Sequence, residues 1–196
     1  MSSDANPTRT RILQAAQQLL EQGDGGQVRM SDIAKAAKIS RQGLYLHFAT
    51  RAELLVALTR WMDEVNDVDR RLAASRQARD GETRLAAFVE AWGNYIPMIH
   101  GVGRALMAMS DSDAEAAAAW AERMQAVRHG CAAAVAALKD QGVLRDGLSE
   151  ERATDLFWTL MSVRNWEQLR QGCGWTQADY VVEMQRLARA ALVELP

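Results

Sequence analysis

The chain of 196 residues contains only two cysteines, and it has no apolar run of the roughly 18 residues that a membrane-spanning helix needs. No helix is therefore expected to cross a membrane. Cys131 and Cys173 stand outside any CxxC or CxxH spacing, so we expect idle, unpaired thiols in a reducing compartment. The first residues also lack the apolar core of a secretory signal. Together these absences predict a cytoplasmic protein.

The motifs of common enzyme classes are absent as well. The sequence contains no HExxH, GxSxG, P-loop or GxGxxG pattern. Its three histidines, His47, His100 and His129, are too few and too scattered for a convincing metal site. We therefore expect no enzymatic activity, no metal and no cofactor.

Helix breakers are scarce, and this scarcity predicts the fold class. Proline occurs three times, alanine is abundant, and runs of β-branched residues are missing. Such a composition favours helices over strands. Apolar residues at helical spacing predict an all-α fold of about nine helices.

Two features of the predicted helices can be placed along the chain. One helix of about 25 residues is expected over residues 51–75, begun by a capping box of Thr50 and Glu53. A kink or a break is expected at Pro97 and at the two glycines that follow it.

Charge is unevenly distributed along the chain. The formal net charge is −2, but residues 1–60 hold eight Lys or Arg against five Asp or Glu. The remainder holds fifteen basic against twenty acidic side chains. Residues 29–51 alone concentrate five basic groups and one acid. This asymmetry predicts that the N-terminal part, residues 1–60, binds a polyanion and that the remainder does not; we call these parts the head and the body.

Residues 30–48, MSDIAKAAKISRQGLYLHF, have the pattern of a helix-turn-helix. Ala34 is small enough for two helices to cross closely. The apolar wedge between the helices is expected to consist of Ile33, Ala37, Ile39, Leu44 and Phe48. Ser40 is expected to cap the second helix, whose first turn would lie in the major groove of DNA.

The exposed residues of that first turn are predicted to read DNA bases. They are Arg41, Gln42 and Gly43. Arginine pairs well with guanine and glutamine pairs well with adenine, while glycine lets the backbone approach closely.

The same segment carries a recognisable set of residues in order. They are Asp32-Ile33-Ala34, Ala37, Ile39-Ser40, Leu44-Tyr45, His47-Phe48, Arg51 and Glu53-Leu54, with Gly174-Trp175 and Tyr180 near the C-terminus. With them the chain resembles the TetR family of bacterial transcriptional regulators. The resemblance implies a three-helix helix-turn-helix DNA-binding domain over residues 1–52 and a helical ligand-binding and dimerisation domain over residues 53–196. It also implies a homodimeric repressor that binds a palindromic operator and is released by a small, largely apolar effector.

Carried over residue by residue, the resemblance implies contacts with the DNA backbone. The Tyr45 hydroxyl, His47 and Arg51 at the start of the next helix would each touch a phosphate. Arg29 stands where the family has a Ser or Thr cap, and it is expected to touch a phosphate too. The candidate DNA contacts are Arg29, Ser31, Ser40, Arg41, Gln42, Gly43, Tyr45, His47 and Arg51.

Two further departures from the family pattern have consequences. Lys38 stands in the turn where a glycine is common, and a positive φ is expected there at some cost in free energy. Gln42 and Gly43 replace the small pair that is usual in the recognition helix. The operator sequence therefore cannot be carried over from the family.

The body has the ingredients of an apolar pocket. The chain contains six tryptophans and nine methionines, and both side chains make adaptable apolar walls. Ordinary helix packing is the alternative at each position. His100 lies in a stretch that resembles the hinge through which the family couples pocket and head. The candidate effector-binding residues are Trp61, Val65, Phe88, Trp92, Tyr95, Met98, His100, Met107, Trp120, Met124, Phe157 and Met161.

The last two predicted helices carry apolar residues on two sides. One way to bury both sides is a four-helix bundle with a second copy of the chain, and the resemblance implies the same dimer. A two-fold dimer would place its recognition helices about one DNA turn, roughly 34 Å, apart. The candidate interface residues are Trp158, Ser162, Asn165, Trp166, Tyr180, Met184, Leu187, Ala188 and Ala191.

Two other functions remain open on the sequence. A regulator of this kind could act without a small molecule, controlled by a protein partner or by its own concentration. Alternatively, the chain could be a helical enzyme or binding protein whose helix-turn-helix does not bind DNA. A cavity large enough for a ligand argues against the first alternative, and DNA binding that is absent or insensitive to salt favours the second.

Overall fold

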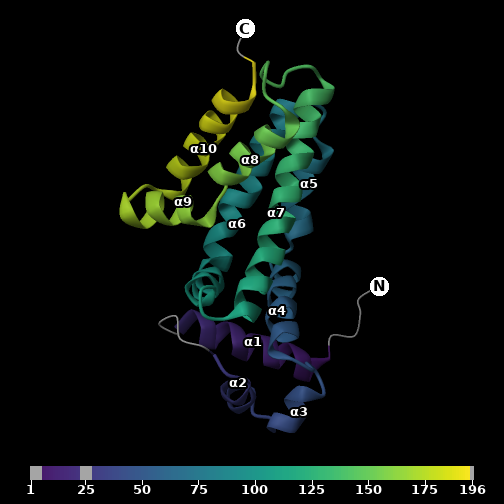
Figure 1. Ribbon diagram of the computed structural model, residues 1–196, viewed down its shortest axis with the longest axis vertical. Helices are drawn as coiled ribbons and strands as arrows, with labels where there is room; N and C mark the ends of the chain where they lie inside the picture. Colours follow the sequence, from purple (N-terminus) through teal and green to yellow (C-terminus); the bar gives the residue numbers. More distant parts are fainter. Residues whose placement is uncertain (1–5, 23–27, 195–196) are drawn as a thin grey trace. The chain divides into compact units, whose positions relative to one another are not determined.

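The computed structural model describes residues 6–22 and 28–194. The predicted all-α fold is confirmed (Figure 1). The elements are α1 (Pro7–Gln22), α2 (Met30–Ala36), α3 (Arg41–Tyr45), α4 (Arg51–Val65), α5 (Val68–Gln77), α6 (Gly81–Met109), α7 (Ala114–Asp140), α8 (Glu150–Leu160), α9 (Val163–Glu167), a π-helical turn η1 (Gln168–Gly172) and α10 (Gln177–Leu192). An isolated antiparallel bridge pairs Leu144 with Val193.

The chain forms two compact units whose boundaries fall partly inside helices. The first unit consists of Met1–Asn66 and Ile99–Arg123, and the second of Asp67–Met98 and Met124–Pro196. Helices α6 and α7 therefore each contribute residues to both units. The predicted boundary after residue 52 does not coincide with a boundary between these units, and the division by function remains a prediction.

In the first unit, α1 packs against α2 and α4, and α2 packs against α3. Helix α1 buries one apolar side, formed by Ile12, Leu13, Ala15, Ala16 and Leu20. Helix α4 begins after Thr50, whose Oγ1 accepts a hydrogen bond from the Glu53 amide at 3.1 Å. The Glu53 carboxylate accepts from the Ala49 amide at 2.8 Å, one residue before the position expected for a capping box.

The single helix expected over residues 51–75 is divided into α4 and α5. Asn66 closes the last turn of α4, because its Nδ2 donates to the Met62 carbonyl at 2.7 Å. Asp67 follows with a φ of 52°. Aspartate is among the few non-glycine residues that adopt this left-handed backbone readily. The apolar residues that predicted one long helix, from Leu54 to Val65, all lie in α4.

The structure shows no break at Pro97 or at the glycines after it, since α6 continues from Gly81 to Met109 with Pro97 inside the helix. Pro97 is exposed and costs the helix one backbone hydrogen bond. Gly101 and Gly103 instead allow neighbouring side chains to pack closely against α6. A Cβ added at Gly101 would lie 2.7 Å from Cγ of Glu21 in α1, and one added at Gly103 would lie 3.0 Å from the Trp120 ring.

The second unit has an aromatic core. The rings of Phe88 and Phe157 meet edge to face with their centroids 5.7 Å apart. The Trp92 indole donates to the Met161 carbonyl at 2.8 Å and lies 5.9 Å from the Tyr95 ring. All five side chains are buried, and α8 packs against α10 in the same unit.

The turn between α2 and α3 confirms the expectation for Lys38, whose φ is 56°. The Lys38 amide donates to the Lys35 carbonyl at 3.1 Å, and the Ile39 amide donates to the Ala34 carbonyl at 3.0 Å. These two bonds form a Schellman motif, which ends a helix with a left-handed residue that is most often glycine.

Replacing Lys38 with glycine is expected to raise the free energy of unfolding by about 1 kcal/mol, because glycine adopts a left-handed backbone without strain. Lys38→Ala removes the same side chain but keeps Cβ, so it is the matched control and should bring no such gain. Urea unfolding followed by circular dichroism measures both. Equal stability of the two variants would contradict a strained turn.

Candidate functional site

Helix α3 is held in place by a cap and by an apolar inner side. Ser40 Oγ accepts a hydrogen bond from the Gly43 amide at 3.0 Å, so the predicted cap is confirmed. Of the predicted wedge, Ile33, Ala37, Leu44 and Phe48 are buried and Ile39 is half-buried. These contacts determine which side of α3 faces outward.

The outward side of α3 presents hydrogen-bonding and charged groups. Arg41 and Gln42 are exposed, and Gly43 is half-buried. Tyr45 is 39% exposed, and the guanidinium carbon of Arg41 lies 5.7 Å from the centre of its ring. That distance is within the range of a cation–π interaction. Leu46 is 83% exposed beside them; we did not predict it, because an apolar residue in this motif usually indicates core.

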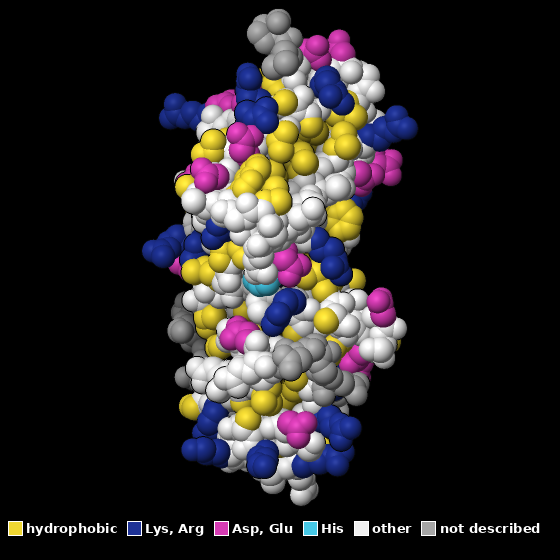
Figure 2. Space-filling model, turned by 90° about the vertical axis from the view of Figure 1, so that its left-hand side faces the viewer, with side chains coloured by type: hydrophobic (Ala, Val, Ile, Leu, Met, Phe, Trp, Pro, Cys, Tyr) yellow, Lys and Arg dark blue, Asp and Glu magenta, His cyan; other side chains and the backbone are white. Residues whose placement is uncertain are grey.

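A basic rim borders α3. Arg29, Lys35 and Lys38 are exposed together with Ser31, and His47 is half-buried. Figure 2 shows Lys and Arg side chains gathered around α2 and α3, at the lower end of the view. Apart from Arg51, every predicted DNA contact thus lies at least partly at the surface. Cations placed in this way can pair with phosphates.

Two arginines of α1 also reach this region, although the sequence did not single them out. The guanidinium carbon of Arg9 lies 4.6 Å from the centre of the Phe48 ring. Arg11 Nε donates to the Ala37 carbonyl at 3.0 Å, at the end of α2. Local spacing gives no signal for either contact, because the partners lie in other helices.

Arg51 is placed differently from the prediction. Its side chain is only 10% exposed, and its Nη1 lies 2.6 Å from Oδ2 of Asp113. Its Nε donates to the Val28 carbonyl at 2.8 Å. The guanidinium binds partners inside the protein, and this argues against the predicted contact between Arg51 and a DNA phosphate. No local motif could have indicated this pair, whose members are 62 residues apart.

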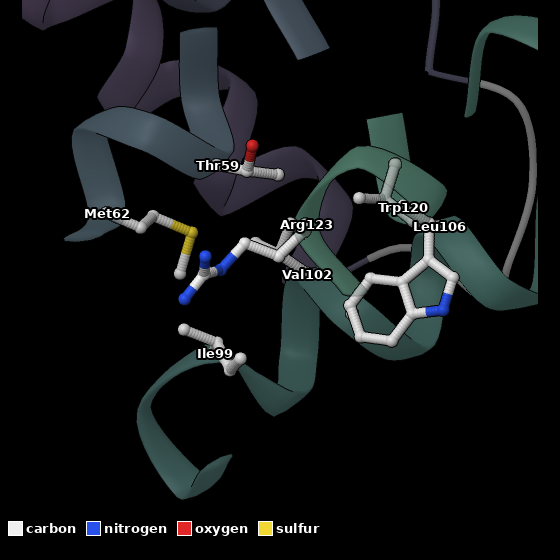
Figure 3. A pocket seen from close by; sticks show the side chains of 8 residues that line it. Thr59, Met62, Ile99, Val102, Leu106, Trp120 and Arg123 are labelled. Atoms are coloured by element: carbon white, nitrogen blue, oxygen red, sulfur yellow. The ribbon is translucent and has the colours of Figure 1, made fainter. Parts of the chain in front are cut away.

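The first unit contains a small cavity between α4, α6 and α7 (Figure 3). Its volume is about 10 Å³, which is room for about one water molecule. In Figure 3 the Arg123 side chain extends between Met62 and Ile99. Arg123 Nη1 lies 3.2 Å from Oδ2 of Asp63. The lining consists of Thr59, Met62, Ile99, Val102, Gly103, Leu106, Trp120 and Arg123, and of the predicted effector residues it includes only Trp120.

The other predicted effector residues have varied surroundings. Phe88, Trp92, Tyr95, Phe157 and Met161 belong to the aromatic core of the second unit, where Met98 is 42% exposed and Met124 is half-buried. In the first unit Met107 is buried, Trp61 and His100 are half-buried, and Val65 is 56% exposed. Trp61 borders an open surface hollow of about 420 Å³.

The predicted dimer residues divide into a buried and a partly exposed group. Trp166, Tyr180, Met184 and Ala188 are buried inside the protomer, and burial raises the pKa of the Tyr180 hydroxyl. These four belong to the protomer's core as the structure has it, not to an open surface. The other five, Trp158, Ser162, Asn165, Leu187 and Ala191, are half-buried.

Exposed apolar side chains lie on the same helices. Leu156 in α8 is 44% exposed and Val182 in α10 is 61% exposed. Figure 2 shows apolar side chains gathered on the side of the second unit where α10 lies. We did not predict Val182, because the helical pattern placed it outside the apolar stripe of α10.

Residues 6–22 and 28–194 offer little other chemistry. In this part of the chain no three His, Cys, Asp or Glu side chains gather where they could hold a metal ion. No helix described there is both long and apolar enough to cross a membrane. Cys131 and Cys173 are both free. Burial raises the pKa of the Cys131 thiol, and this favours an unreactive, protonated state.

A comparison with known families identifies the helix-turn-helix. Residues 12–58 match the family model described as bacterial regulatory proteins, tetR family. The helix-turn-helix of this chain is of the TetR family. The matched part covers most of α1, all of α2 and α3, and the first half of α4.

Curated relatives match part of the chain. The nucleoid occlusion factor SlmA of Marinomonas sp. is 36% identical over 64 residues, which are 33% of this chain and 32% of the relative. The HTH-type transcriptional regulator UidR of Escherichia coli is 35% identical over 81 residues, which are 41% of this chain and 39% of the relative. The chain thus spans 32% to 39% of the length of these curated relatives.

A solved structure extends the likeness to the whole fold. The transcriptional regulator FadR from Bacillus subtilis, in complex with stearoyl-CoA, superposes with a TM-score of 0.75. The match covers 93% of this chain and 98% of the other, at 15% sequence identity. At that identity it shows a shared fold, which includes the second unit that the family model does not reach.

Proposed function

We propose that this TetR-family protein is a transcriptional regulator that binds operator DNA through α3. The observation that carries the proposal is the exposed Arg41 and Gln42 on a capped helix, bordered by the cations of the basic rim. An α-helix fits the major groove, where arginine and glutamine can each make bidentate bonds to a base. The opposite side of α3 is fixed by buried Leu44, so the reading side is presented rigidly.

The proposed contacts divide into base reading and backbone positioning. Arg41 and Gln42 read bases, while the Tyr45 hydroxyl, His47 and Arg29 hold phosphates. Ser31, Ser40 and Gly43 lie close to the backbone, and the Ser40 hydroxyl can still donate its hydrogen while it accepts from Gly43. DNA binding would place the protein in the cytoplasm of a bacterial cell.

A homodimer is the second part of the proposal. Leu156 on α8 and Val182 on α10 are exposed apolar side chains, and Trp158, Leu187 and Ala191 on the same two helices are half-buried. A second copy of the chain would cover these helices in a four-helix bundle. The two recognition helices would then lie about 34 Å apart and match a near-palindromic operator.

Release of DNA by a small, largely apolar effector is the third part. The FadR structure with stearoyl-CoA supports it by fold likeness. Regulation without a small molecule is the alternative, and the water-sized volume of the Trp120 cavity favours it. A ligand that bound at that cavity would have to separate α4, α6 and α7.

DNA binding is tested with purified protein and a fluorescent duplex taken from the DNA flanking its gene. We expect preference over random duplex, and an affinity that falls about 1,000-fold or more between ~50 and ~200 mM salt.

Tyr45→Phe should weaken binding by about 3- to 10-fold, because the variant has no hydroxyl to donate a hydrogen bond. Gln42→Ala should change the preferred base at one position of each half-site.

Arg145, which is exposed in the second unit, provides a matched control for the arginine contact. Arg41→Ala should weaken binding and Arg145→Ala should leave it unchanged. Equal effects of the two variants would remove α3 from the interface. Binding that does not respond to salt would refute the proposed function.

The dimer is tested by placing a charge on its proposed face. Val182→Asp should shift the protein toward monomer in sedimentation velocity at micromolar concentration, because a carboxylate would be buried without a partner. Val65→Asp changes a similarly exposed valine in α4 and should leave the dimer intact. A Val182→Asp protein that sediments like the unaltered chain would place the interface elsewhere.

The effector is tested on the protein–DNA complex with stearoyl-CoA as the probe and free coenzyme A as the control. If a long apolar chain is the recognised part, stearoyl-CoA should release the duplex and raise the melting temperature of the free protein. Coenzyme A alone should do neither. The same results with both compounds would contradict recognition of an apolar effector of this kind.

A further inference from the structure

The first unit contains a charge cluster around one largely buried arginine. Its centre is the guanidinium of Arg51, the first residue of α4. Nη1 lies 2.6 Å from Oδ2 of Asp113 and 3.5 Å from Oε2 of Glu115. The side chains of Arg51 and Asp113 are 10% and 6% exposed, whereas that of Glu115 is 43% exposed. The main pair is therefore Arg51 with Asp113.

The guanidinium also joins segments that are distant in the sequence. Its Nε donates to the carbonyl of Val28, just before α2, at 2.8 Å. Its Nη2 lies 3.8 Å from the sulfur of Met109, the last residue of α6. One side chain thus contacts the entrance to α2 and the turn between α6 and α7, and it begins α4 itself.

Asp113 is a rigid partner because it also caps α7. Its Oδ1 accepts from the amides of Glu115 at 3.1 Å and of Ala116 at 3.2 Å. Its Oδ2 is left for Arg51. The carboxylate lies at the N-terminus of a 27-residue helix, where the helix dipole favours a negative charge. The position of Asp113 is therefore fixed by α7, and Arg51 is held against it.

A second contact holds the helix-turn-helix on the same helices. Glu21, near the end of α1, lies against Gly101 of α6, where an added Cβ would meet its Cγ at 2.7 Å. The first unit therefore joins the α1–α3 region to the end of α6 and the start of α7 at two separate places.

We propose that the Arg51–Asp113 ion pair positions α2 and α3 for operator binding, so that Arg51 controls DNA affinity without touching DNA. The proposal rests on the proposed DNA-binding function. The pair fixes the entrance to α2 through Val28, and α3 follows α2 through the tight turn at Lys38. Loss of the pair frees the entrance to α2 and lowers the fraction of molecules in which both recognition helices fit the operator.

The variants separate a positioning role from a phosphate contact. Asp113→Asn keeps an amide oxygen for the cap, since asparagine is as good an N-cap as aspartate, but removes the charge opposite Arg51. Asp111→Asn changes an exposed aspartate two residues earlier and is the matched control. Arg51→Met combined with Asp113→Asn removes both charges, so no unpaired charge is left buried if a single variant fails to fold.

Operator affinity at several salt concentrations is the first measurement. Asp113→Asn and the double variant are expected to weaken binding about tenfold or more, with the slope of log affinity against log salt unchanged. If Arg51 neutralised a phosphate, the double variant would instead reduce the magnitude of that slope by about 0.9 per protomer, or about 1.8 for the proposed dimer, and Asp113→Asn would bind much like the unaltered protein. Asp111→Asn should bind normally.

Hydrogen exchange of the α2 amides gives a readout that needs no DNA. Exchange should be faster in Asp113→Asn than in Asp111→Asn, while amides of α10 exchange as before. Normal affinity and normal α2 exchange in Asp113→Asn would overturn the positioning role. Absence of salt-sensitive DNA binding in the unaltered protein would refute the proposed function instead, and α2 exchange would still test the ion pair.

Discussion

The arrangement of the first unit depends on the need to balance one buried cation. A guanidinium with 10% of its side chain in water cannot rely on solvent, so the protein must supply the opposite charge. Asp113 supplies it and is held in place by the first amides of α7. This requirement explains why residues 62 positions apart in the sequence belong to one compact unit. The helix-turn-helix and the α6–α7 turn are therefore parts of one structure.

The features that could be predicted from the sequence are local ones. The caps at Ser40 and Thr50 accept from amides three residues later. The positive φ of Lys38 is expected because it stands where the TetR family commonly has a glycine. The buried wedge of Leu44 and Phe48 follows from helical spacing alone. Each depends on a few neighbouring residues, so the chemistry of the segment is enough to predict α2, α3 and the outward side of α3.

The features that could not be predicted depend on partners far along the chain. A glycine in a helix can break it or admit a neighbour, and only the presence of Glu21 and Trp120 shows that Gly101 and Gly103 admit neighbours. An aromatic residue at helical spacing suits a pocket, a core or an interface equally well. Trp92 and Tyr180 are both buried in the protomer, although one was expected at an effector and the other at a dimer partner.

The left-handed Lys38 has a consequence for how binding responds to ionic strength. Glycine would relax the backbone of this turn, but it would leave the surface around α2 and α3 with one cation fewer. The protein accepts about 1 kcal/mol of backbone strain in every folded molecule. The Lys38 side chain adds one positive charge to this surface. A polyanion feels that charge within about one Debye length, which is about 8 Å at physiological salt and longer in dilute salt. The strained turn is therefore accompanied by an attraction that is strongest in dilute salt.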